Sequence, residues 1–227
     1  MISPKDCWIT DKCSENCDKD SPFCLKLFKL DFLYNQALFS NQQRKHINLH
    51  VDSDGTDKEA FKQLQQIESN IVDFINKGNN LFIRSINPGT GKTSWTLRLV
   101  QAYFNQIWYK CELTCKALFI NVPRFLLALK DNISKEDPYI SHIKENVLKA
   151  DVVIWDEVGV KSLTTFEHEN LLNLINTRID MNKSNLYTSN LTLDELKEKV
   201  GDRLYSRIVN NSVNFEFFGQ DKRNLNV

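Results

Sequence analysis

The chain of 227 residues has no excess of charge of either sign, because 29 lysines and arginines balance 29 aspartates and glutamates. Bulk attraction to a polyanion is therefore excluded, and any contact with nucleic acid must come from a local patch. The sequence also has no apolar run near the roughly 20 residues that cross a bilayer. Its N-terminus mixes charged and polar residues and has no signal peptide. We expect a cytoplasmic protein with no membrane partner, in a reducing compartment where structural disulfides are rare.

Internal repeats and low-complexity tracts are absent as well, and disorder is not the default for this composition. Hydrophobic residues make up 41% of the chain and charged residues 26%, which is enough apolar material for a core. The composition changes along the chain and divides it into three zones. We expect a cysteine-rich segment over residues 1–30, a polar linker over 31–56 and one regular domain over 57–227.

The regular zone begins with apolar residues at three- and four-residue spacing, which predicts an amphipathic helix that ends at Gly78. Short apolar runs then alternate with helical stretches, and this predicts an α/β fold with a parallel sheet covered on both faces. The expected strands are 81–86, 117–122, 152–155, 186–189 and 213–218. The expected helices are 92–108, 123–131, 138–149, 165–181 and 192–210, the last with a break near Gly201.

A glycine-containing loop between the first of these strands and its helix predicts a phosphate-binding site. Gly89 and Gly91 have no Cβ, so backbone N–H groups can approach phosphate oxygens, and the helix N-terminus adds the positive end of its dipole. Lys92 would lie between the β- and γ-phosphates, and the Thr93 hydroxyl would bind Mg²⁺. The candidate nucleotide-binding residues here are Asn87, Pro88, Gly89, Thr90, Gly91, Lys92, Thr93 and Ser94.

The loop departs from the usual pattern at its entry, where Ile86 stands in place of the opening glycine. Asn87-Pro88 can make the same turn by other means. The alternative interpretation of the whole stretch is a glycine-rich turn beside an exposed lysine.

Two adjacent carboxylates, Asp156 and Glu157, follow the apolar run Val152–Trp155. A buried strand in this position would deliver Asp156 to Mg²⁺ and place Glu157 to polarise an attacking water as general base. The alternative is a solvated strand end.

The next strand closes with Thr188-Ser189-Asn190, and the Asn190 amide could orient water between Glu157 and the γ-phosphate. Alternatively, Asn190 or Thr192 caps the helix that follows.

Arg203 and Arg207 lie four residues apart and share a helix face. An arginine from a neighbouring subunit can stabilise charge on the γ-phosphate, so we place Arg207 in a subunit interface. The alternative is a solvated basic face paired with Asp202.

Taken in order, these four signatures resemble the AAA+ ATPases. The stretches 154–159 and 188–192 look more narrowly like the DnaC/DnaI-type replicative helicase loaders and the related IstB transposition ATPases. The resemblance covers roughly residues 57–227. It implies a P-loop NTPase fold with a five-stranded sheet in the order 5-1-4-3-2 and no lid domain.

The resemblance also implies residue roles. Lys92 and Thr93 would contact ATP and Mg²⁺, Asp156 and Glu157 would form the Walker B pair, and Asn190 would be sensor 1. Arg207 matches the arginine finger, and Arg203 matches its partner. The catalytic candidates are thus Glu157, Asn190, Arg207 and Arg203, and the Mg²⁺ candidates are Thr93 and Asp156.

Four cysteines, Cys7, Cys13, Cys17 and Cys24, lie within 18 residues in a segment too short to bury a core alone. Four thiolates suit tetrahedral zinc, whose binding would fold the segment, although the spacing is not the paired CxxC of strong zinc motifs. DnaI-like loaders carry an N-terminal zinc-binding domain that contacts the helicase, which supports this hypothesis. The alternative is unligated thiols on an arm.

The favoured function is an ATP-dependent loader that places a hexameric replicative helicase on single-stranded DNA during replication initiation. Self-association through AAA+ interfaces, and stimulation of ATP hydrolysis by DNA or helicase, would follow. One alternative is an IstB-like ATPase helper of a DNA transposase. A second is an adaptor that binds ATP and scarcely hydrolyses it.

Overall fold

A computed structural model describes residues 7, 23–49, 51, 55–131 and 137–222. Its centre is a sheet of five parallel strands in the order β2-β3-β4-β1-β5. Read from the other edge, this is the predicted order 5-1-4-3-2, which is therefore confirmed. The strands are β1 Asn80–Arg84, β2 Ala117–Asn121, β3 Val152–Asp156, β4 Ser184–Ser189 and β5 Ser212–Glu216.

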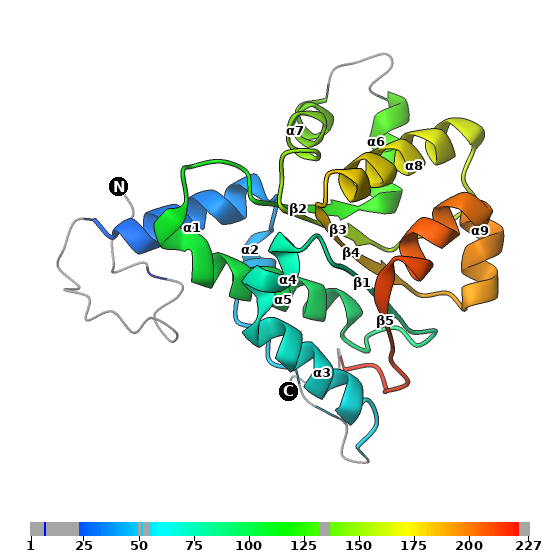
Figure 1. Ribbon diagram of the computed structural model, residues 1–227, viewed down its shortest axis with the longest axis horizontal. Helices are drawn as coiled ribbons and strands as arrows, with labels where there is room; N and C mark the ends of the chain where they lie inside the picture. Colours follow the sequence, from blue (N-terminus) through cyan, green and yellow to red (C-terminus); the bar gives the residue numbers. More distant parts are fainter. Residues whose placement is uncertain (1–6, 8–22, 50, 52–54, 132–136, 223–227) are drawn as a thin grey trace.

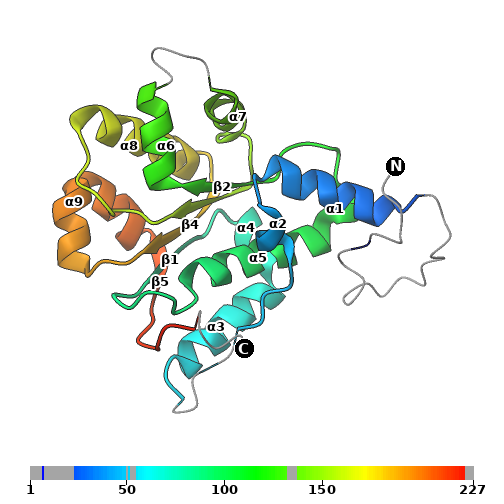
Figure 2. The same ribbon diagram turned by 180° about the vertical axis from the view of Figure 1, so that it is seen from behind.

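Helices cover both faces of this sheet (Figures 1 and 2). The first layer holds α1 Leu25–Gln36, α2 Asn41–Arg44, α3 Lys58–Ser69, α4 Ile71–Asn76 and α5 Lys92–Ile107. The second layer holds α6 Val122–Asp131, α7 Pro138–Asn146, α8 Thr165–Asp180 and α9 Leu193–Tyr205, which continues into a π-helical turn, Ser206–Asn210.

Alternate residues of the central strands supply the two halves of the core. Val152 and Ile154 of β3 are buried against the first layer, while Val153 and Trp155 are buried against the second. Such two-sided burial explains why the strands appear in the sequence as continuous apolar runs. Within the described ranges, no helix is both long and apolar enough to cross a membrane.

The segment expected to be a polar linker, 31–56, contributes to this core. Leu33, Tyr34 and Phe39 are buried, and the Tyr34 ring meets Phe104 of α5 edge-on at 5.1 Å between centroids. The backbone N–H of Phe119 in β2 also donates to the carbonyl of Ala37 at 2.9 Å. The buried residues of 30–49 lie in the core on the α5 side of the sheet, and Leu38 packs against the core on the other side. The part of the expected linker up to residue 49 is therefore not a free connection.

The helix expected between Asp57 and Gly78 is divided at Asn70, where the backbone leaves the helical region. Gly78 ends the second piece at a φ of 67°, as the sequence predicts.

Because all five strands run in parallel, the loops after β1, β3 and β4 meet at one edge of the sheet. The fold thereby brings the phosphate loop, the carboxylate pair and the Thr-Ser-Asn stretch together.

Candidate functional site

The loop between β1 and α5 has the backbone of a phosphate-binding turn. Gly89 and Gly91 adopt φ angles of 68° and 97°, which a side chain would disfavour. Gly91 is the N-cap of α5, so the free N–H groups of the first helical turn begin at Lys92. Ile86, the residue in place of the usual first glycine, is 60% exposed, so its side chain is not packed into the core.

The Lys92 side chain is buried within the loop. Its ammonium group donates to the Asn87 carbonyl at 3.0 Å and to Thr90 Oγ1 at 3.4 Å. These two hydrogen bonds hold the ammonium group at the loop. The predicted alternative, an exposed lysine beside a turn, does not describe this side chain, which is 7% exposed.

A hydrogen-bonded group of oxygens connects the helix after the loop to two strands. Thr93 Oγ1 donates to Asp156 Oδ1 at 2.7 Å, and Thr188 Oγ1 donates to the same oxygen at 2.8 Å. Asp156 is 5% exposed. Burial raises the pKa of this carboxyl, and the hydrogen bonds from Thr93 and Thr188 oppose the rise.

This set of oxygens suits Mg²⁺, which prefers carboxylate, hydroxyl and phosphate ligands. Thr93 and Asp156 are the side chains of the group that would hold the ion, as the sequence predicts. Thr188, to which the sequence assigned no separate role, orients Asp156.

Glu157 follows directly in an unusual backbone conformation, with a φ of 62°. Its backbone N–H donates to Thr188 Oγ1 at 3.0 Å, and its Oε2 accepts a hydrogen bond from Asn121 Nδ2 at 2.8 Å. A positive φ in a non-glycine residue stores strain and is frequent at functional sites. Asn121 is not among the site residues predicted from the sequence, where the available signal is a polar amide at the end of the β2 apolar run.

The end of β4 is joined to this turn by two further bonds. Ser189 Oγ donates to the Val158 carbonyl at 2.8 Å, and the Val158 N–H donates to the Thr188 carbonyl at 2.9 Å. Thr192 caps α9 in a capping box with Glu195, which assigns the capping role to Thr192. Asn190 is exposed between these two features. Its role as sensor 1 stays a prediction.

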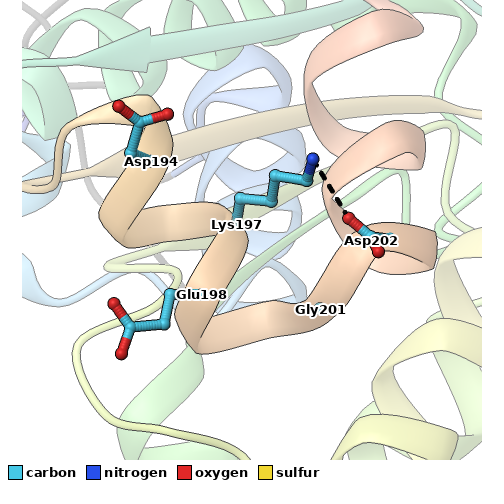
Figure 3. Close-up of a pocket in the computed structure, with 5 residues that line it drawn as sticks. All are labelled: Asp194, Lys197, Glu198, Gly201 and Asp202. Carbon is cyan, nitrogen blue, oxygen red and sulfur yellow. Dashed lines mark ion pairs between the residues drawn. The ribbon is translucent and has the colours of Figure 1, made fainter.

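Arg203 and Arg207 follow a kink in α9. Gly201 interrupts the helix with a φ of 77° and a ψ of 160°. Both arginines are exposed, Arg203 at the end of α9 and Arg207 in the π-helical turn. The alternative prediction pairs Asp202 with the basic face of these arginines. In the structure, Asp202 forms its ion pair with Lys197 at 3.2 Å (Figure 3).

The kink also forms an open hollow of about 400 Å³ lined by acidic and basic side chains. Figure 3 shows Asp194, Lys197, Glu198, Gly201 and Asp202 around it. None of these residues belongs to the phosphate loop or to the carboxylate pair, so this hollow is separate from the candidate nucleotide site.

Half of the cysteine cluster, Cys13 and Cys17, lies outside the described residues. Cys24 is the N-cap of α1, where its Sγ accepts the Leu27 N–H at 3.5 Å. No metal-binding group of three or more side chains occurs within the described part of the chain, which holds only two of the four cysteines. The zinc site therefore stays a prediction.

Comparisons with known proteins agree with this geometry. A family model described as IstB-like ATP binding protein matches residues 37–213. The crystal structure of the DnaC helicase loader is 17% identical, with a TM-score of 0.62, over 79% of this chain and 100% of that chain. The crystal structure of DnaI is 16% identical, with a TM-score of 0.60, over 82% and 94%. A search of curated proteins gave no match.

A third solved structure, the replication initiator DnaA bound to AMPPCP and single-stranded DNA, is 21% identical with a TM-score of 0.55. The similarity covers 73% of this chain and 47% of that one. At these identities, all three structures establish likeness of fold alone.

The sheet order and the family match define an AAA+ P-loop domain that binds ATP. More narrowly, the chain belongs to the family of IstB-like ATP-binding proteins, whose model matches well over half of its length. The resemblance to this family and to the helicase loaders, predicted from the motifs, is thereby confirmed.

Proposed function

We propose that this protein is an ATPase that loads a hexameric replicative helicase onto single-stranded DNA. The observation that carries the proposal is the hydrogen-bonded group of Thr93, Asp156 and Thr188 beside the buried Lys92. Lys92 supplies a positive charge for the phosphates, and Thr93 and Asp156 supply oxygens for Mg²⁺, all at one edge of the sheet. The fold shared with DnaC and DnaI supports the choice of loader.

In this proposal each residue of the site has a defined task. Lys92 neutralises the terminal phosphates, and Thr93 and Asp156 hold Mg²⁺, which spreads the negative charge of the phosphates when bound. Glu157 takes a proton from the attacking water, which Asn190 orients. Arg207 of one subunit reaches the γ-phosphate held by its neighbour, with Arg203 beside it, so hydrolysis depends on assembly.

Hydrolysis is tested by Glu157→Gln, which keeps the shape of the side chain and removes the base. We expect binding of MgATP to persist and single-turnover hydrolysis to fall by about a hundredfold or more. A wild-type protein that binds ATP and does not hydrolyse it with DNA or helicase present would favour the adaptor hypothesis.

The second candidate function is that of a helper for a DNA transposase, favoured by the IstB-like family match. Co-purification separates the two candidates. A loader retains the replicative helicase and is stimulated by single-stranded DNA, whereas a transposase helper retains a transposase and responds to duplex DNA. Retention of the transposase alone would overturn the loader assignment.

We also propose that Cys7, Cys13, Cys17 and Cys24 bind zinc and that the segment 1–30 contacts the helicase. Residues 31–56 would join it to the ATPase domain at 57–227 as a packed connection, because residues up to 49 contribute to the core. Support comes from the number of cysteines and from the resemblance to DnaI-like loaders. Cys24 lies at the start of α1, which packs on α5, so a folded zinc segment would be attached directly to the domain.

A further inference from the structure

The chain returns to the phosphate loop after β5. Residues 217–222, which we name the strap, leave the sheet and run toward the start of α3 (Figure 1). Phe217 begins the strap and is buried, with its ring 5.2 Å from that of Phe61 in α3. Its N–H donates to the Arg84 carbonyl at 2.9 Å, which places the strap beside the strand that leads into the loop.

Two side chains fasten the middle of the strap. The Asp57 carboxylate accepts the N–H groups of Phe218 at 2.8 Å and Gly219 at 2.9 Å. Asn87, a residue of the phosphate loop itself, donates from Nδ2 to the carbonyls of Phe218 and Gly219, both at 3.2 Å. The strap is therefore hydrogen-bonded to the loop through a side chain as well as to α3.

The end of the strap lies against the loop backbone. The Lys222 N–H donates to the Gly89 carbonyl at 3.0 Å. The Asp221 carboxylate fills the space that a side chain on Gly89 would need, since a Cβ there would lie 1.7 Å from Oδ1. Gly89 thus permits close contact between this carboxylate and the loop.

A carboxylate at this place resembles the ligand of the loop. The glycine turn and the α5 N-terminus attract anions through their N–H groups and the helix dipole. Asp221 carries a negative charge, and a nucleoside triphosphate brings several further negative charges to the same small region. The two repel each other, and the repulsion grows with the number of phosphates.

We propose that Asp221 is a built-in competitor of the nucleotide phosphates, so that the strap lowers nucleotide affinity until it moves away from the loop. This inference rests on the proposed ATP site and adds its regulation. Asn87 is a loop residue whose side chain is hydrogen-bonded to the strap, so a conformational change of the loop on nucleotide binding would directly alter the strap contacts. A partner that displaced the strap would raise the affinity of the site for ATP.

The test is the affinity of the full chain for MgATP and MgADP, measured by calorimetry for wild type and Asp221→Asn. The substitution removes the charge and keeps the size. Asp221 is exposed, so solvent screens it, and we expect about fivefold tighter binding of MgATP. The gain should be smaller for MgADP, which has one phosphate fewer, and should shrink at high salt. Asp180→Asn is the matched control, because Asp180 is an exposed aspartate at the C-terminal end of α8, and it should have no effect on affinity.

Each outcome decides between the hypotheses. Equal affinity of wild type and Asp221→Asn for MgATP would show that the strap only packs against the loop. Weaker binding by Asp221→Asn would show that Asp221 helps to bind the nucleotide. Either result overturns the proposal. If wild type and both variants all fail to bind MgATP while folded, the proposed nucleotide site itself fails, and the inference fails with it.

Discussion

Asn121 Nδ2 donates a hydrogen bond to Glu157 Oε2 at 2.8 Å, which ties the last residue of β2 to the carboxylate that follows β3. β2 and β3 are neighbours, and Asn121 is in register with Asp156. Glu157 is held at its backbone by Thr188 as well, so both its carboxylate and its main chain have fixed partners. The proposed base is thus positioned from the strands on either side of it.

Replacing Asn121 by alanine should release the Glu157 carboxylate from β2. A hydrogen bond to a charged group contributes about 1.5–3 kcal/mol, so its loss frees the base to turn toward the phosphates. We expect single-turnover hydrolysis to rise about two- to fivefold with MgATP affinity unchanged. A fall in hydrolysis would show that Asn121 orients the base for reaction instead of restraining it.

Arg207→Ala should leave MgATP binding intact and lower hydrolysis in the assembled state by about a hundredfold or more, because the arginine acts on a neighbouring subunit. Arg203→Ala should have a smaller effect. Mixing Arg207→Ala with Lys92→Ala subunits should restore part of the activity, since one supplies the site and the other the arginine. Loss of binding by Arg207→Ala, or no recovery on mixing, would point to a structural role.

The Glu167 carboxylate should make stability depend on acidity. It is 1% exposed and accepts hydrogen bonds from Lys161 at 2.7 Å and from the Thr164 N–H at 2.9 Å, with Lys130 3.2 Å away. Burial alone would raise its pKa, and these partners outweigh burial and lower the pKa from 4.5 to about 2. Its contribution is therefore complete above pH 4.5 and is lost as the pH falls toward 2.

We expect Glu167→Gln to reduce the free energy of unfolding by about 1–2 kcal/mol at neutral pH, because the paired lysines are partly exposed and screened. The difference from wild type should vanish in urea titrations near pH 2. Glu195→Gln, in the exposed capping box of α9, is the control and should cost less. A difference for Glu167→Gln that persists unchanged at low pH would contradict the account.

Zinc content tests the cysteine hypothesis. Atomic emission should find about one zinc per purified chain, and the double change Cys13→Ser and Cys17→Ser should remove it. Cys111→Ala, a buried cysteine beside α5, should keep the metal. A wild-type chain without zinc, purified without chelator, would leave the four thiols unligated.

The phosphate loop and the carboxylate pair could be predicted because each consists of residues adjacent in the sequence, in a strand-loop-helix context. The order of the strands came from the family resemblance, since strand periodicity alone does not say which strands pair. Contacts between distant residues could not be predicted: Asn121 meets Glu157, and the strap reaches the loop, only after the sheet is assembled.

The packing of α1 escaped prediction for a different reason. Its apolar residues are spread around the helix instead of forming one stripe, with the buried Leu27, Leu30 and Leu33 interspersed with the partly or largely exposed Leu25, Phe28 and Phe32. A periodicity argument needs a single apolar face, so the sequence pattern places residues 25–30 in the cysteine-rich segment and residues 31–36 in the polar linker.

Binding of MgATP to wild type and to Lys92→Ala, with hydrolysis measured on the same samples, tests the central claim most directly. The Lys92 ammonium is buried within the loop, so its loss removes the positive charge that the proposed site offers to the phosphates. We predict at least about tenfold weaker binding and at least about a hundredfold slower hydrolysis, with no change for the exposed control Lys77→Ala. Unchanged binding and turnover in Lys92→Ala would contradict the assignment of this loop as the ATP site.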